Sequence, residues 1–333
     1  MKKTIFAILA TVAMVACSND EIVSLNQEAI QFGNAFVDNS VRGAYDPSYG
    51  ATNKVDGVDT PINLTSFNVY GNVMGTTKPV EVFNGEAVSG TVGANSEWTC
   101  TKTQYWIESA RYNFAAVVNG VVKEEFAYDA NTPASYANAY LPKTIEFATV
   151  TDATVDLLYA RSIEYTGQPA GQNTQKVEFT FDHLLSKVKF SVENKSKAAT
   201  GYSFLVKNVN VNAVKAASYD VANKEWGTGS TADFALANVE LTNSTDATVE
   251  SAAEKLVIPG TVKVSFTVDV IYDGETITSK NYGPYSVDVA AGKAYNLKAE
   301  VAVGEEIKFT VKQNPSWVDG GTTTYPTNPL PQN

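Results

Sequence analysis

The clearest pattern along the chain is a strict alternation of apolar and polar residues. Valine or phenylalanine occupies every second position from Val262 to Val270, and Lys, Ser, Thr or Asp lies between them. A period of two is typical of a strand that buries one face. Asp273-Gly274 follows, and the alternation resumes over residues 275–278. Because an Asp-Gly pair tolerates the positive φ of a type I′ turn, this segment predicts a hairpin.

The same alternation recurs along most of the chain. Residues 112–118 show it, and Asn119-Gly120 then turns the chain into residues 121–122, which predicts a second hairpin. Further alternating runs lie at residues 177–181, 188–192 and 307–311. Many short strands separated by Gly, Asn and Asp, without a long 3.6-residue period, predict an all-β fold of antiparallel sandwiches. Helix is expected only in short connections.

A polar stretch divides this β-rich body. Residues 166–174 read Thr-Gly-Gln-Pro-Ala-Gly-Gln-Asn-Thr, a composition that fits either a long loop or a domain junction. Since roughly a hundred residues suffice for one sandwich, we predict two tandem domains, 43–172 and 173–318. The tail, 319–333, contains three prolines. A proline lacks the N–H that a ladder needs, so this tail cannot form a central strand.

The first residues have the anatomy of an export signal. Residues 1–3 are basic, and residues 5–15 form an apolar run too short to span a bilayer, which needs about 20 residues. Met-Val-Ala-Cys at 14–17 resembles the bacterial lipobox, which implies that residues 1–16 are removed and that Cys17 is acylated. The alternative is an ordinary signal peptide followed by a chance cysteine. Ser-Asn-Asp-Glu at 18–21 is similar to the acidic tether of surface lipoproteins in Bacteroidota, which implies the outer membrane and the cell surface.

Composition excludes several classes of chemistry. The 333 residues include 36 Asp and Glu against 25 Lys and Arg, a formal net charge of −11. Nucleic acid and anionic lipid select clustered Lys and Arg, so neither is expected as the main partner. The only histidine is His183, which excludes a zinc site with two histidines and a His-dependent catalytic set centred elsewhere. Phosphate-loop, dinucleotide, H-E-x-x-H and EF-hand motifs are absent. We predict no enzyme activity, metal or cofactor.

The two residues with the most reactive side chains both have a simpler structural interpretation. His183 ends the run Phe-Thr-Phe-Asp-His, which favours a structural role at a strand end. Cys100 lies in the β-like run 98–101 and is expected to pack as a small apolar residue. If Cys17 carries lipid, Cys100 has no disulfide partner within the chain. A strongly lowered thiol pKa would revive the nucleophile interpretation.

The segment before Arg42 carries a functional hypothesis. Ile30, Phe32 and Phe36 share one parity, so a strand here would place three large apolar groups on one face. Arg42-Gly43 follows in a polar stretch where a trypsin-like protease could cut. The alternative is that this segment is simply the first strand of a finished domain.

Several segments, in order, resemble the fimbrillin family of Bacteroidota, the subunits of protease-matured type V pili. They are Ile-Gln-Phe at 30–32 with Val-Arg at 41–42, Trp98 with Gln-Tyr-Trp at 104–106 and Tyr-x-Phe-x-Ala at 112–116, the run at 181–190, Leu-Val-Ile-Pro-Gly at 256–260 and Ala-Gly-Lys-Ala-Tyr-Asn-Leu at 291–297. The resemblance covers almost the whole mature chain.

The resemblance implies two transthyretin-like sandwiches, exported as a lipoprotein and assembled with other pilus subunits outside the cell to support adhesion. An Arg-specific protease would cut between Arg42 and Gly43 and remove a strand carrying Ile30, Phe32 and Phe36. Segment 17–42 is therefore expected to hold both the lipid and the removable strand. An extended segment of a neighbouring subunit would then fill the groove by β-augmentation.

One feature departs from the family pattern. A stalk subunit needs a donor segment near its end, yet residues 307–311 look like the last strand of the second sandwich. Either 307–311 belongs to the donor, or 321–325 is a short donor, or the protein is an accessory, tip or anchor subunit.

Two rival hypotheses place the protein in other functional classes. One is a surface lipoprotein that binds glycan through exposed aromatics, and the other is an enzyme acting on surface polysaccharide through two carboxylates.

Overall fold

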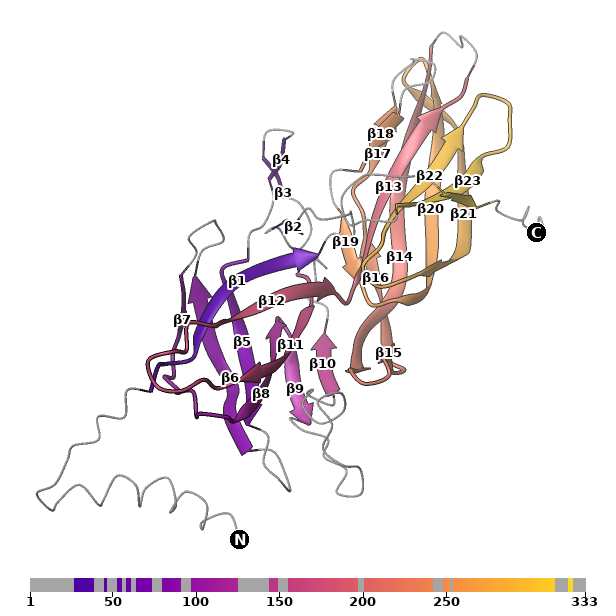
Figure 1. Ribbon diagram of the computed structural model, residues 1–333. Helices are drawn as coiled ribbons and strands as arrows, with labels where there is room; N and C mark the ends of the chain where they lie inside the picture. Colours follow the sequence, from indigo (N-terminus) through magenta and orange to yellow (C-terminus); the bar gives the residue numbers. More distant parts are fainter. Residues whose placement is uncertain are drawn as a thin grey trace, which may run out of the picture.

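The computed structural model describes part of the chain in detail. The described residues are 27–38, 45–46, 53–55, 58–60, 64–73, 80–90, 97–124, 144–148, 155–196, 201–241, 248–251, 254–314 and 323–325. Regular structure in these ranges is entirely β, which confirms the all-β part of the predicted fold. Figure 1 shows two lobes, one built mainly from the earlier strands and one from the later strands. No helix in the described ranges is long and apolar enough to cross a membrane.

The first lobe is a sheet that closes on itself. Its strand order is β12-β11-β8-β5-β6-β7-β1-β2, and β12 also pairs with β1, so seven strands form a ring. A closed sheet has no free edge among the strands of the ring. The strands are β1 (Gln31–Asp38), β2 (Tyr45–Asp46), β5 (Ser66–Val73), β6 (Val80–Gly90), β7 (Trp98–Cys100), β8 (Arg111–Val118), β11 (Leu158–Thr166) and β12 (Lys176–His183).

The second lobe consists of two sheets packed around one core of valine, leucine and phenylalanine side chains. In one sheet, β21-β20-β14-β10-β9, the strands are β9 (Val121–Glu124), β10 (Thr144–Ala148), β14 (Tyr202–Asp220), β20 (Gly260–Tyr272) and β21 (Glu275–Val289), with β15 (Glu225–Trp226), β16 (Ser230–Ala235) and β17 (Val239–Leu241) also on β14. In the other sheet, β18-β13-β22-β23-β24, they are β13 (Ser186–Asn194), β18 (Thr248–Glu250), β22 (Ala294–Val301), β23 (Lys308–Asn314) and β24 (Thr323–Tyr325), with β19 (Lys255–Val257) on β13. A separate pair joins β3 (Asn53–Val55) and β4 (Val58–Thr60).

The hairpin predicted at Asp273-Gly274 is confirmed. Strands β20 and β21 pair antiparallel from Gly260 opposite Val289 to Tyr272 opposite Glu275. Both turn residues have positive φ, 49° and 85°, as a type I′ turn requires. The alternating apolar residues of β20 face the core, because the pleat directs every second side chain inward.

The hairpin predicted at Asn119-Gly120 is wrong. Both strands exist, but β8 pairs with β5 and β11 in the first lobe, whereas β9 pairs with β10 in the sheet of the second lobe. Asn119 has φ 63° and its side-chain amide donates to the backbone oxygen of Asp156 at 2.8 Å. A Cβ at Gly120 would lie 2.6 Å from Ile145 Cγ2 and 2.7 Å from Leu157 Cδ1. The glycine therefore allows close packing between two sheets and does not close a hairpin.

Two strand pairings are parallel, which differs from the antiparallel pattern expected from the sequence. They are β1 with β12 and β13 with β22. The polar stretch 166–174 connects β11 to β12, which pair with each other in the first lobe, so it is a loop within that lobe. After this loop the chain stays in the first-lobe sheet until β12 ends at His183, and β13, which begins at Ser186, belongs to the second lobe. The division at 172 and 173 and the transthyretin-like topology stay predictions.

The chain crosses between the two lobes at β9 and β10, and an apolar cluster packs the lobes together. Strand β10 comes from the middle of the first-lobe sequence but pairs with β14 from Thr144 opposite Asp220 to Ala148 opposite Ala216. In Figure 1, β9 and β10 lie beside β8 and β11 at the lower end of β14. Side chains from both lobes form a buried cluster here, including Tyr70, Ile145 and Tyr219. The lobes therefore meet through this apolar cluster and through the strands β9 and β10, which the first-lobe part of the sequence contributes to the second lobe.

Replacement of Gly120 by alanine tests this close packing between the sheets. The new methyl group would overlap Ile145 and Leu157, so we expect Gly120→Ala to lower the free energy of unfolding by about 1–3 kcal/mol. The neighbouring Val121 is 58% exposed, and Val121→Ala should change it by less than about 0.5 kcal/mol. Urea titration followed by far-UV circular dichroism measures both. Equal midpoints for the two variants would contradict the packing role of Gly120.

Candidate functional site

Strand β1 is held by four different segments of the chain. It pairs parallel with β12 from Gln31 opposite Lys176 to Val37 opposite Phe181. On its other side it pairs with β7 at Phe32 opposite Trp98 and with β2. Just before the strand, the N–H of Ile30 donates to the oxygen of Gln104 at 2.8 Å. The strand thus closes the ring of the first lobe, as Figure 1 shows.

The inward side of β1 is apolar and almost fully buried. Ile30 is 6% exposed and Phe32 is 2% exposed, so the predicted shared face holds for these two residues. The pairing with β12 then shifts register between Phe32 and Ala35. After that irregularity the buried positions are Ala35 and Val37, at 2% and 0%, because extra residues in a strand change which parity faces inward. Phe36 pairs with Thr180, and its side chain lies outside the described residues.

Phe32 is surrounded by four other phenylalanine rings. Ring centroids lie 5.6 Å away at Phe83, 6.2 Å at Phe179, 6.4 Å at Phe67 and 6.5 Å at Phe114. Full burial of a phenylalanine contributes about 1.5–3 kcal/mol, and favourable ring geometry adds about 0.5–1.5 kcal/mol for each pair. This group of rings, hereafter the Phe32 cage, is the centre of the first-lobe core.

A glycine on β5 makes room for the Phe32 cage. An added Cβ at Gly71 would lie 2.7 Å from Phe114 Cδ1 and 3.1 Å from Phe83 Cδ2. Every side chain other than hydrogen would therefore displace one of these two rings of the Phe32 cage, Phe83 or Phe114. Sequence reasoning missed both Gly71 and the cage partners, because the alternation marks inward positions without telling which strands face each other.

The predicted cleavage residues lie outside the described residues, but their neighbours are described. Arg42 and Gly43 belong to the six residues between β1 and β2. At the ends of that connection, Val37 pairs with Asp46 and Asp38 pairs with Tyr45. The connection therefore joins two adjacent antiparallel strands. Cys17 also lies outside the described residues.

Comparison with known proteins identifies the family. The profile of the fimbrillin-like family matches residues 52–315, which is more than half of the chain. This chain belongs to the fimbrillin-like family. No curated protein sequence is similar enough to match it.

Solved structures add to the comparison. A fimbrial protein from Bacteroides vulgatus is 13% identical with a TM-score of 0.51, over 76% of this chain and 93% of that chain. This match shows a shared fold. The fimbrial anchor protein Mfa2 from Porphyromonas gingivalis is 9% identical with a TM-score of 0.37, over 86% and 96%. A fimbrial assembly protein from Parabacteroides distasonis is 16% identical with a TM-score of 0.40, over 78% and 90%.

His183 of this fimbrillin-like protein is buried at the junction of the two lobes. Its side chain is 1% exposed, and its Nδ1 contacts Oδ2 of Asp156, whose side chain is fully buried. The other carboxylate oxygen of Asp156 accepts from the N–H of Leu157 at 2.8 Å. Since both groups are enclosed and partnered, the arrangement fits the structural role that the sequence favours.

Cys100 is half-buried against the core of the first lobe. Burial raises the pKa of its thiol, so the thiol stays protonated near neutral pH. A protonated thiol is a poor nucleophile, which supports packing as the role of Cys100. No group of three or more Asp, Glu, His or Cys able to hold a metal ion occurs within the described ranges.

Exposed aromatic residues were expected to mark a glycan platform if the rival hypothesis held. Among the described residues, the exposed aromatics are Tyr105, at 51%, and Tyr272, at 43%. Tyr105 lies in the first lobe and Tyr272 in the second, where its ring is tilted by 47° against Tyr202. Two exposed rings in different lobes do not form the joint surface that stacks on a sugar. The described surface therefore gives no support to the glycan hypothesis.

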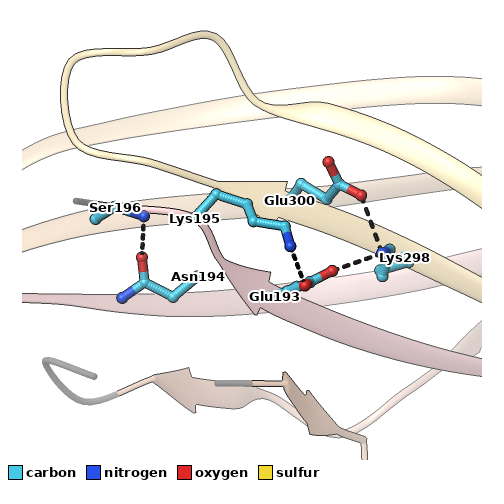
Figure 2. Close-up of polar contacts among 6 residues, drawn as sticks. All are labelled: Glu193, Asn194, Lys195, Ser196, Lys298 and Glu300. Carbon is cyan, nitrogen blue, oxygen red and sulfur yellow. Dashed lines mark hydrogen bonds and ion pairs between the residues drawn. The ribbon is translucent and has the colours of Figure 1, made fainter. Parts of the chain in front are cut away.

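A connected set of charged groups lies on the outer face of β13 and β22 (Figure 2). Glu193 accepts from Lys195 and from Lys298, the latter at 2.6 Å. Lys298 also contacts Glu300 at 2.9 Å. Burial raises the pKa of Glu193, but hydrogen bonds from Lys195 and Lys298 outweigh it and lower the pKa below its usual range. The network links charged side chains of β13 and β22, which pair in parallel, and so supports the structure of the second lobe.

We expect Phe32→Ala to destabilise the folded protein strongly. The substitution leaves a cavity inside the Phe32 cage, and such changes cost about 3–5 kcal/mol. The adjacent Gln31 is exposed, so Gln31→Ala is the matched control and should cost less than about 0.5 kcal/mol. Urea titration of the uncut protein measures both. A loss of less than about 1 kcal/mol for Phe32→Ala would mean that β1 contributes little to the core.

The charge network predicts a pH-dependent loss of stability. A carboxylate whose pKa is lowered on folding adds stability above its unfolded pKa, about 4.3, and loses it as pH falls through the folded value. Glu193→Gln should therefore lower the free energy of unfolding by about 1 kcal/mol at pH 7, and the difference from the original protein should vanish toward pH 3. Urea midpoints between pH 3 and 7 measure it. A difference independent of pH would exclude the ionic role.

Proposed function

We propose that this fimbrillin-like protein is a structural subunit of a cell-surface pilus, matured by an Arg-specific protease and assembled by strand exchange with other pilus subunits. One observation carries the proposal. Strand β1 closes the first-lobe ring, buries Phe32 in the cage, and is joined to the rest of the chain through the connection that contains Arg42 and Gly43. A cut there makes β1 a separate chain held only by non-covalent contacts.

Removal of β1 would leave a groove shaped for another strand. Its walls would be β12 on one side and β7 on the other, and its floor would be the four phenylalanines of the cage. A strand that enters such a groove gains backbone hydrogen bonds and places alternate side chains in the pockets. At about 0.5–1.5 kcal/mol per hydrogen bond and 1.5–3 kcal/mol per large side chain, the gain is on the order of 10 kcal/mol before entropic costs. A filament joined in this way would dissociate very slowly.

The distribution of arginine supports a single cut. The chain contains three arginines, at 42, 111 and 161. Arg111 pairs with Thr166 and Arg161 pairs with Ala115, inside the β8–β11 ladder. A protease needs an extended, unpaired substrate, so both bonds are protected in the folded protein. Arg42 is the remaining candidate.

Anchoring and location follow from the signal region. In this proposal Cys17 is acylated, residues 1–16 are removed, the lipid holds the protein at the outer membrane, and cutting at Arg42 separates the body from the lipid. The protein then belongs to the fimbrium and supports adhesion. An acidic chain, with a net charge of −11, stays solvated and soluble outside the cell. A subunit that kept its lipid and was not cut would act as an anchor.

The structure bears on the choice of donor segment. Phe309 and Val311 of β23 are 2% and 5% exposed in the second-lobe core, and β23 lies between β22 and β24. Using residues 307–311 as donor would open that core. Strand β24, in contrast, pairs with β23 at only three positions. We therefore propose that the segment around 321–325 is the donor.

Cutting the purified precursor with an Arg-specific protease tests the proposal. We expect cleavage after Arg42, followed by oligomers that resist dodecyl sulfate and form a ladder on gels. Arg42→Lys keeps the charge but removes the cleavage site, so this variant should stay uncut and monomeric under the same conditions. N-terminal sequencing of the product should begin at Gly43.

A protein that is cut after Arg42 but remains monomeric would contradict a stalk function. A precursor that resists the protease at Arg42 while remaining folded would instead favour the anchor role.

A further inference from the structure

The two sides of β1 are held very differently. On the β12 side, five residue pairs run from Gln31 to Val37. On the other side, within the described ranges, β1 pairs with β7 at one position, Phe32 opposite Trp98, and with β2 at two positions near its end, Val37 and Asp38. The next contact of this neighbouring segment is at Gln104, whose backbone oxygen accepts from the N–H of Ile30. Residues 99–103 thus lie opposite Gln31 alone, between two points of attachment.

A cleft of about 330 Å³ occupies this gap. Its walls carry mostly polar side chains, including Glu97, Thr99, Lys102, Thr103 and Lys176, and it reaches Phe32 and Trp98. Lys102 is held in place by Glu86 at 3.0 Å and by the backbone oxygen of Val82 at 3.1 Å. The cleft therefore has a fixed wall and lies directly beside the Phe32 cage.

We propose that this cleft is the site where the incoming strand of a second copy of this chain docks while β1 is still in place. The inference rests on the proposed strand exchange and adds the place on the protein where that exchange begins. Departure of β1 before docking would open the whole Phe32 cage to water at once. Docking first lets the incoming strand replace β1 residue by residue, so the core stays filled and the barrier is lower.

The occupant is the segment around residues 319–325 of the second copy. This segment carries Asp319 and no Lys or Arg, and its other residues are mostly Gly and Thr. A small segment with one acidic side chain fits a cleft in which Lys176 can receive that charge, whereas Lys102 is already paired with Glu86 and Glu97 is the one acid of the lining. Its residues 323–325 already form a strand, which pairs antiparallel with Val311–Gln313 of β23.

Filling the cleft with a large side chain tests the proposal. Thr103→Trp places an indole in the cleft, whereas Thr101→Trp adds the same group to an exposed neighbour outside its lining. After complete cleavage at Arg42, release of the N-terminal fragment and growth of the ladder are followed at several protein concentrations. We expect both rates to rise in proportion to concentration in the original protein. Thr103→Trp should slow both at least ten-fold, and Thr101→Trp less than two-fold.

Equal rates of cleavage at Arg42 and equal thermal midpoints show that Thr103→Trp is folded. Lys176→Glu, which leaves the cleft open and reverses one charge, provides a second variant and should slow exchange about three-fold at low salt. Ladder growth that is independent of concentration and unaffected by Thr103→Trp would overturn the inference and leave the proposed function intact, because β1 would then leave before docking.

A second readout works even if no ladder forms, an outcome that would contradict the proposed function. In the full uncut chain with Cys17→Ser, Cys100 is the only thiol, and it lines the cleft. A synthetic peptide of residues 319–326 at millimolar concentration should slow alkylation of Cys100 at least three-fold. The same peptide should have no effect in the Thr103→Trp background. Absence of protection in the Cys17→Ser protein would overturn docking in the cleft.

Discussion

Burial of Phe32 by β1 is the interaction on which the first lobe depends. Six of the seven ring strands come from residues 66–183, and together they leave one gap. Strand β1 fills that gap and supplies the ring at the centre of four others. A closed sheet needs each of its strands, because removing one exposes two edges and the core between them. The first lobe is therefore complete only while some strand occupies this position.

The second lobe does not share this dependence. Its longest ladders, β14 with β20 and β20 with β21, lie within the lobe, and its core cluster contains no residue of β1. The cluster that joins the lobes is likewise built without β1. Opening the first-lobe groove would therefore leave the second lobe and the junction in place. The proposed exchange of β1 would therefore leave the overall framework of the protein in place.

The parts of the fold that could be predicted from the sequence are those fixed by local interactions. The hairpin at Asp273-Gly274 depends on two turn residues and an alternation beside them, so its prediction was confirmed. Strand β1 was expected, and the inward positions of Ile30 and Phe32 follow from parity. Its pairing with β12, about 145 positions later, could not be predicted, because alternation specifies a face and leaves the partner open.

Two other features were hidden for the same reason. Asn119-Gly120 has the composition of a hairpin turn, but its flanking strands pair in different sheets, so the local signal was misleading. The irregularity after Phe32 moves the inward face to Ala35 and Val37. That shift depends on how β1 meets Lys176 and Glu178 of β12, whose side chains approach Gly33 closely. Only the tertiary structure contains this information.

Under the proposed strand exchange, the unequal sides of β1 would reconcile two opposing requirements. The precursor must remain folded until it is cut, which needs a strand that is firmly held. The mature subunit must then accept a replacement, which needs access to the same position. The parallel ladder with β12 meets the first requirement, and its inward residues, Val177, Phe179 and Phe181, would set the register of either strand. The sparse contacts with β7 meet the second, since displacement can begin on that side while the β12 ladder still holds the core closed.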